Sequence, residues 1–124
     1  MPRARRPEDD AQRAVMEWLR YQHPEVYRYT IHVPNGGARS KAEAGIFKAL
    51  GVKAGFPDLI CLEPRGPYIG LAVERKAEGA RPSSVRPDQV AWLELLREVG
   101  WRAEWAAGFS GARAIFSSYI AGSE

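Results

Sequence analysis

Apolar side chains recur at helical spacing in two stretches of the N-terminal half. Residues 8–21 carry such a stripe, and Pro24 ends it, because the residue before a proline avoids helical backbone angles. Ser40-x-x-Glu43 forms a capping box that opens a short second helix, and Gly51 suits its C-terminal end. The spacing therefore predicts one helix at the N-terminus and a shorter one near residue 45.

The C-terminal half has the same kind of pattern twice more. Residues 87–99 follow it, with Pro87 suited to the first turn and Gly100 to the stop. A last helix is expected to begin at a Ser110 cap and to end near Ala121. Two further helices are predicted here.

Strands are predicted between these helices, where β-branched, aromatic and apolar residues gather. They cover residues 27–33, 58–62, 68–76 and 101–106, and the turn at 63–67 makes a hairpin of the second and third. Helices alternating with strands indicate an α/β domain on one mixed four-stranded sheet flanked by helices. The chain is expected to form a single domain over residues 1–124, with residues 1–7 as a flexible basic arm.

Composition narrows the class of protein. With 124 residues, 45% of them hydrophobic, the chain has the size and make-up of one globular domain. Its apolar runs are far shorter than the roughly 20 residues of a membrane span, and no signal peptide precedes them, so we expect a cytoplasmic protein without a membrane partner. The single Cys61 excludes a disulfide framework, and no glycine-rich phosphate loop supports a nucleotide cofactor.

Positive charge is concentrated in the middle of the chain. Residues 28–86 carry ten basic and five acidic side chains, whereas residues 87–124 carry three and five. A phosphate-rich partner such as DNA fits this distribution, and a solvated basic surface is the alternative. The candidate contacts with DNA are Asn35, Arg39, Lys41, Lys48, Lys53, Arg81 and Arg86.

The most informative residues are Pro57-Asp58 and, after fifteen intervening residues, Glu74-x-Lys76. In the 68–76 strand Glu74 and Lys76 share a face with the small residues Gly70 and Ala72, because side chains alternate between faces. The hairpin brings Asp58 opposite Glu74. Two carboxylates beside an ammonium group favour a Mg²⁺-like ion with a lysine next to the reacting water.

This constellation resembles the VRR-NUC domain of the PD-(D/E)xK nuclease superfamily. The resemblance covers residues 8–105 and rests on Gly55-Phe56-Pro57-Asp58-Leu59, Glu74-Arg75-Lys76, Gln89, Trp92, the leading Glu8-x-x-x-Gln12 and Asn35-Gly36-Gly37. It implies a restriction-endonuclease-like α/β fold and hydrolysis of DNA phosphodiester bonds with Mg²⁺ or Mn²⁺. It also implies that Asp58 and Glu74 bind the metal together with the backbone carbonyl of Arg75, and that Lys76 acts on the attacking water.

Two site residues have alternatives that the sequence leaves open. Gln89 shares the inward face of its helix with Leu93 and Leu96, so it either joins the site or satisfies backbone groups of the first turn. Glu8 is either a further carboxylate ligand of the metal or a favourable charge at a helix N-terminus.

The expected function is a Mg²⁺-dependent, structure-selective endonuclease for DNA like a Holliday junction, by resemblance to short phage and bacterial members of the family. A homodimer would supply two active sites for two strands, and its contact is expected among C-terminal aromatic residues left outside the core. The alternatives are a repair or restriction-like nuclease acting on flaps or duplex DNA, a catalytically silent DNA-binding module, and a basic interaction protein.

Overall fold

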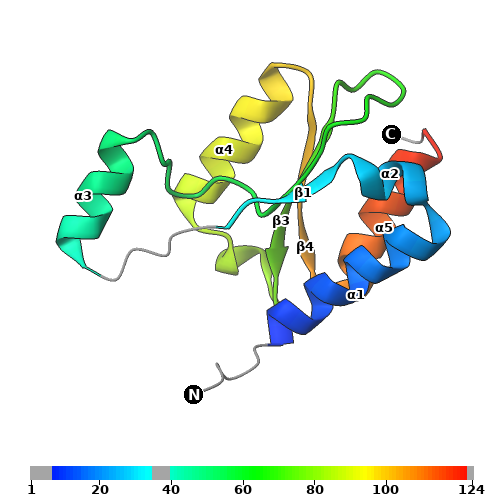
Figure 1. Cartoon of the computed structure of the whole chain (residues 1–124), viewed down its shortest axis with the longest axis horizontal. Coiled ribbons are helices and arrows are strands. Elements are labelled where there is room, and N and C mark those ends of the chain that lie inside the picture. The colour runs from blue at the N-terminus through cyan, green and yellow to red at the C-terminus, as the bar shows by residue number, and fades with distance from the viewer. Residues whose placement is uncertain (1–6, 35–39, 123–124) are drawn as a thin grey trace.

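The computed structural model describes residues 7–34 and 40–122, and of Pro7 and Glu8 it describes the backbone alone. Within this part, four strands and the helices around them follow one another in the order shown in Figure 1. The elements are α1 (Pro7–Gln22), α2 (Pro24–Arg28), β1 (Thr30–His32), α3 (Lys41–Ala49), β2 (Leu59–Cys61), β3 (Leu71–Lys76), the 3₁₀ turn η1 (Pro82–Ser84), α4 (Pro87–Glu98), β4 (Arg102–Ala107) and α5 (Gly108–Ile120).

The strands form one mixed sheet in the order β1-β2-β3-β4. The first two pairings are antiparallel, and β3 pairs with β4 in parallel. The predicted hairpin is confirmed, with Leu59 opposite Val73 and Cys61 opposite Leu71. Because β3 and β4 are parallel, the chain between them has to cross over the sheet, and α4 lies in this connection. The predicted α/β class with a mixed four-stranded sheet is correct.

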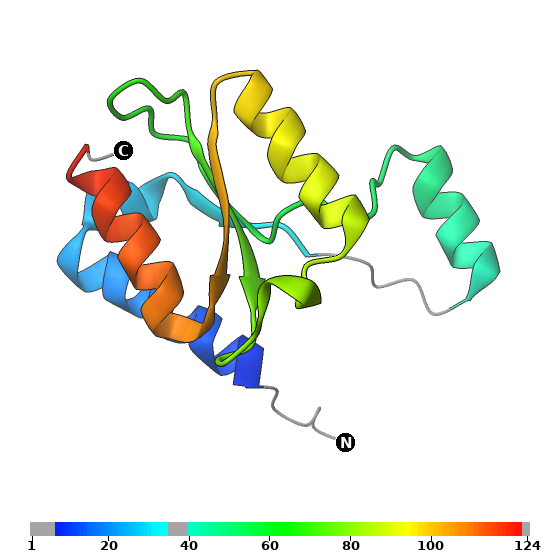
Figure 2. The same cartoon turned by 180° about the vertical axis from the view of Figure 1, so that it is seen from behind.

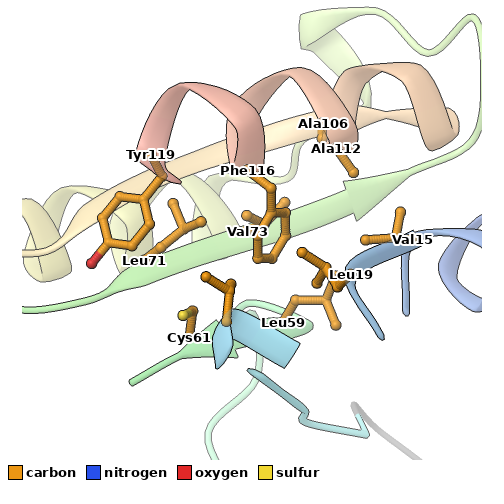
Figure 3. Packing of buried hydrophobic residues seen from close by; sticks show 11 residues of the cluster. Val15, Leu19, Leu59, Cys61, Leu71, Val73, Ala106, Ala112, Phe116 and Tyr119 are labelled. Atoms are coloured by element: carbon orange, nitrogen blue, oxygen red, sulfur yellow. The ribbon is translucent and has the colours of Figure 1, made fainter. Parts of the chain in front are cut away.

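The two faces of the sheet are covered differently. Helices α1, α2 and α5 lie together on one side, whereas α4 lies on the other (Figures 1 and 2). Under α1 and α5, side chains from both helices meet Leu71 and Val73 of β3 in an apolar cluster that includes Phe116 and Tyr119 (Figure 3). Under α4 the cluster is smaller and is formed by Ile60, Ala72, Leu93, Leu96 and Ala103. Successive side chains of β3 point to opposite faces and enter the two clusters in turn. The strand is therefore buried on both faces.

The small residues of β3 and the residue before it have a clear packing role. A Cβ atom at Gly70 would overlap the ring of Trp101, so that ring occupies the space that a larger side chain would need. Ala72 is fully buried next along the same face. The space beside Gly70 and Ala72, the small residues that share a face with Glu74, is thus filled by Trp101 and by α4.

Residues 27–33 do not form the single strand that was predicted. Only Thr30–His32 are extended, because α2 occupies Pro24–Arg28. Pro24 ends α1 as predicted, but it also begins the next helix, where its fixed backbone angle and missing N–H are tolerated. Thr30 Oγ1 donates to the carbonyl of Val26 at 2.7 Å and ties the strand to this helix.

Two smaller expectations change near the chain ends. Helix α5 begins at Gly108, where the backbone turns at a φ of +65°, so Ser110 lies inside the helix and does not cap it. Pro7 already belongs to α1, and the rest of the predicted basic arm lies outside the described residues. In the described part, no helix combines the length and apolarity that a membrane crossing needs.

The C-terminal aromatic side chains are divided between the core and a partly exposed group, which includes Phe109. Phe116 and Tyr119 are fully buried, and Trp101 and Trp105 are half-buried against the cluster under α4. Large apolar side chains are exposed elsewhere in the described residues, at Ile46 and Leu50 near α3 and at Ile69, Leu95 and Val99. Helix α3 has no buried residue and extends away from the sheet, beyond α4 (Figures 1 and 2).

Candidate active site

The site forms where β2 begins and β3 ends. Because Leu59 pairs with Val73, Asp58 comes next to Glu74 across the hairpin. The side chain of Asp58 extends the ladder by one bond, since its Oδ2 accepts from the backbone N–H of Arg75 at 2.9 Å. Both acidic residues are buried, with 8% of Asp58 and 3% of Glu74 exposed. The sequence placed these carboxylates together, and the structure confirms it.

Gln89 joins the two functional residues of β3 from the first turn of α4. Its Nε2 donates to Glu74 Oε1 at 2.9 Å, and its Oε1 accepts from Lys76 Nζ at 2.8 Å. Glu74 and Lys76 therefore lie on the same face of β3, toward α4, as alternation predicted. The Gln89 amide thereby fixes the orientation of the Glu74 carboxyl group and of the Lys76 ammonium group.

Gln89 has contacts of both kinds that the sequence left open, with Glu74 and Lys76 and with the backbone before α4. Besides Lys76, its Oε1 accepts from the backbone N–H of Arg86 at 2.9 Å, which satisfies one of the free donors before α4. The side chain is 4% exposed, so these hydrogen bonds are shielded from water. The start of α4 and the orientation of the site thus depend on the same side chain.

The electrostatics of Glu74 point to a missing positive charge. Burial raises the pKa of its carboxyl to about 8, with further contributions from the neighbouring Asp58 carboxylate, while Lys76 and Arg86 lower it. Glu74 Oε2 is buried and accepts no hydrogen bond within the described residues. Even with Lys76 and Arg86 nearby, the protonated form of this carboxyl is favoured at neutral pH, and a divalent cation bound beside it would favour the charged form.

These residues fit a hard divalent cation. Carboxylate oxygens are the ligands that Mg²⁺ and Mn²⁺ prefer, and Glu74 has a buried oxygen to offer beside Asp58. Among the side chains that the structure describes, no group of three or more histidine, cysteine or acidic residues could hold a metal ion. The described carboxylates therefore make a two-residue site that needs further ligands from backbone, water or another acid.

The first turn of α1 reaches this end of the sheet. Arg75 directs its guanidinium to the face opposite Glu74, where Nη2 lies 3.9 Å from Asp9 Oδ1. The sequence pattern gave no sign of this contact between α1 and β3. The side chain of Glu8 and the whole of Asn35 and Arg39 lie outside the described residues, so these three predictions remain as they were.

The other basic candidates lie on segments that adjoin the site along the chain. Lys41 and Lys48 are on α3, and Lys53 follows that helix in the loop leading to Asp58. Arg81 and Arg86 flank η1, between β3 and α4. All five are exposed, and Arg86 also pairs with Asp88 at 3.2 Å.

Two further neighbours of Asp58 were not found from the sequence. The ring of His32 lies against its backbone, with Nδ1 3.1 Å from the carbonyl oxygen, and Trp92 binds the loop before it through Ala54. Trp92 entered the sequence analysis only as part of the resemblance to the VRR-NUC domain, without a contact partner. Nothing in the local pattern shows these contacts, because each joins segments that are far apart in the sequence.

Comparison with known proteins agrees with this geometry. Residues 6–110 match the model of the VRR-NUC domain. The chain belongs to the VRR-NUC family. A solved structure described as a VRR_NUC domain protein is similar over 98% of this chain and 94% of its own, with a TM-score of 0.81 and 33% sequence identity. No curated protein sequence matches.

The VRR-NUC match covers every residue of the buried cluster. Asp58, Glu74, Lys76 and Gln89 all lie within residues 6–110, and so does Trp92. The resemblance noted from short motifs is therefore confirmed over most of the chain, and with it the α/β nuclease fold. The family is one of nucleases, which makes a nucleic acid the expected partner of the basic segment.

Proposed function

We propose that this VRR-NUC protein is a metal-dependent, structure-selective endonuclease that hydrolyses phosphodiester bonds of branched DNA similar to a Holliday junction. The observation that carries the proposal is the network in which Gln89 joins Glu74 and Lys76 beside Asp58. A silent DNA-binding module would have no need for two buried carboxylates next to an oriented ammonium group. Burial of such groups costs free energy that function must justify.

Asp58 and Glu74 would hold Mg²⁺ or Mn²⁺, together with the backbone carbonyl of Arg75 and with Glu8. The contact of Asp9 with Arg75 supports a place for Glu8, because it keeps the first turn of α1 next to the end of β3. A bound cation would supply Lewis-acid activation of the phosphoryl group and of water.

Lys76 has the clearest role among the residues of the chain itself. Gln89 holds its ammonium group in one orientation, so that a fixed positive charge faces the site. There it orients the attacking water and stabilises the negative charge that develops on the phosphoryl oxygens. The water oxygen gives up a proton to solvent as it forms a bond to phosphorus, the bond from phosphorus to the leaving sugar oxygen breaks, and that oxygen takes up a proton from solvent.

The proposal includes a homodimer, because one chain has one site and a junction must be cut on two strands. The C-terminal aromatic residues give no support for the contact, since Phe116 and Tyr119 are in the core. Sedimentation without DNA at micromolar protein should give about twice 13.8 kDa. A monomer that still cuts opposing strands with first-order dependence on protein would contradict paired sites.

The experiment that tests the function is cleavage of four-way junction, flap, plain duplex and single-stranded DNA of matched sequence, with Mg²⁺, Mn²⁺ or EDTA. We expect paired cuts on opposing strands of the junction, only with a divalent ion. Preferred cutting of flaps or duplex would replace the junction by those substrates. Binding without cutting in any metal would leave a DNA-binding module.

Two substitutions make this experiment specific for the site. Asp58→Asn and Glu74→Gln each remove a carboxylate charge with almost no change of volume, so cleavage should be lost while the fold and DNA binding persist. A matched control is Glu98→Gln, which removes an exposed carboxylate at the far end of α4. Cleavage by either site variant at the wild-type rate would remove these residues from the mechanism.

A further inference from the structure

The loop of residues 53–57 is fastened to α4 just before it delivers Asp58. The indole Nε1 of Trp92 donates to the carbonyl of Ala54 at 3.1 Å. The ring of Phe56 packs edge-to-face on the same indole, with 5.1 Å between ring centroids and 81° between planes. Two residues of one short loop are therefore held by a single side chain of the helix.

Gly55, between them, makes the contact closer still. Its backbone has a φ of +85°, and a Cβ atom there would lie 2.8 Å from the carbonyl carbon of Asp88. Only a residue without a side chain allows the loop to come this near to the first turn of α4. The loop therefore contacts α4 at Asp88 and again one turn later at Trp92.

The same helical segment also holds the other half of the site. Gln89 lies between these two contact points and binds Glu74 and Lys76. Helix α4 thus holds Asp58 through the 53–57 loop and Glu74 through Gln89. Asp58 also accepts from the backbone N–H groups of Val33, at 2.7 Å to its carbonyl, and of Arg75, and the His32 ring lies 3.1 Å from the same carbonyl.

We propose that Trp92 is a positioning residue of the nuclease site: by fastening the 53–57 loop to α4 it sets where the Asp58 carboxylate lies relative to Glu74. The proposal rests on the metal-dependent function proposed above. Trp92 does not contact the carboxylates, so its effect passes through the loop. Its removal lowers the fraction of molecules in which both carboxylates are in place, and the apparent affinity for a cation falls by that fraction.

The test compares Trp92→Phe, which keeps a ring against Phe56 but loses the bond to Ala54, with Trp92→Ala, which loses both. Binding of Mn²⁺ without DNA, followed by calorimetry, should weaken about tenfold for Trp92→Phe and further for Trp92→Ala. At saturating Mn²⁺ the cleavage rate of Trp92→Phe should return to within about twofold of wild type. Gly55→Ala should weaken binding by a second route, since its methyl group pushes the loop from Asp88.

The matched control is Trp101→Phe, which changes another half-buried indole on the same face of the sheet, near the start of β3. A second readout is hydrogen exchange of the Val33 and Arg75 amides, both bonded to Asp58. Their exchange should become about tenfold faster in Trp92→Phe and stay unchanged in Trp101→Phe. This readout needs no metal and no catalysis.

The outcomes separate the two proposals. A wild-type protein that neither binds Mn²⁺ nor cuts DNA contradicts the proposed function, while the exchange measurement still decides whether Trp92 fixes Asp58. If wild type is active but both Trp92 variants bind Mn²⁺ as it does, the positioning role is wrong. It is equally wrong if Trp101→Phe weakens binding as much, because the effect would then be general loss of packing.

Discussion

Strand β3 separates two halves of the molecule that differ in kind. Leu71 and Val73 face α1 and α5, where the cluster contains apolar side chains alone. Ala72, Glu74 and Lys76 face α4, where a smaller apolar cluster adjoins buried and partly buried polar groups. The six residues of this one strand thus serve a core on one side and a candidate active site on the other.

The comparison shows how a domain of this size can accommodate buried charge. An unpaired buried carboxylate costs several kcal/mol by general estimates, and a net stability of about 5–15 kcal/mol leaves little room for it. The α1 and α5 side, with fully buried Phe116 and Tyr119, supplies most of the apolar burial, and the Tyr119 hydroxyl there donates to the carbonyl of Glu63 at 2.6 Å. We therefore expect changes on that side to alter stability, and changes on the α4 side to alter chemistry.

The largest effect is expected from Phe116→Ala. This side chain is fully buried inside the cluster between α5 and the sheet (Figure 3). Its truncation should lower the free energy of unfolding by about 3–5 kcal/mol, as measured by urea denaturation. Phe116→Leu should act in the same direction with a smaller loss.

The control for Phe116 is Ile69→Ala, where the side chain is 51% exposed and the change should stay within about 0.5 kcal/mol. The Mn²⁺ affinity of the folded fraction should be unaltered in both variants. A marked fall in affinity for folded Phe116→Ala would mean that the two faces of β3 are not separable.

Lys76→Ala is the corresponding test on the other face. Gln89 keeps its bonds to Arg86 and Glu74, so α4 should start as before and stability should change little. The cleavage rate at saturating metal should fall by about 10²–10³, the usual cost of removing an oriented electrostatic group. If Mn²⁺ affinity falls in step with the rate, Lys76 is a structural neighbour of the site and not part of the reaction.

Residues with local signals were predicted well from the sequence. Asp58, Glu74 and Lys76 followed from strand alternation and one tight turn, and Gln89 from helical spacing. The first strand was predicted too long because the aromatic residues Tyr27 and Tyr29 favour strands, whereas Pro24 starts a helix that runs to Arg28. The contact of Trp92 with Ala54 spans 38 residues, and only the folded chain brings such partners together.

The pH dependence of stability should distinguish the faces as well. The pKa of Glu74 is raised from about 4.5 to about 8 by burial and by Asp58, so the folded state retains a proton that the unfolded chain has lost. In EDTA, the contribution of Glu74 to stability should therefore be full below about pH 4.5, fall as pH rises to about 8, and then level off.

Glu74→Gln should reduce this decline in stability, because the amide does not ionise. In wild type, saturating Mn²⁺ should also reduce the decline, because the cation stabilises the charged carboxylate. Urea denaturation at about pH 5, 6.5 and 8 measures the decline across this window, with Glu98→Gln as the matched change on α4. A decline as steep in Glu74→Gln as in wild type would assign the dependence to other groups.

The smallest effect concerns the exposed basic residues that adjoin the α4 face. If Lys53 and Arg81 contact phosphates, binding of branched DNA releases counterions, and affinity falls steeply with salt. Charge reversal at either position should flatten the plot of log affinity against log salt by about one unit for each phosphate that the protein no longer neutralises. Arg20→Glu, at the last turn of α1 on the other side of the sheet, changes net charge equally and should leave the slope nearly as it was. Equal slopes for all three variants would show that net charge alone attracts DNA. Flattening confined to the Lys53 and Arg81 variants would place the DNA backbone along the α4 face, over the carboxylates.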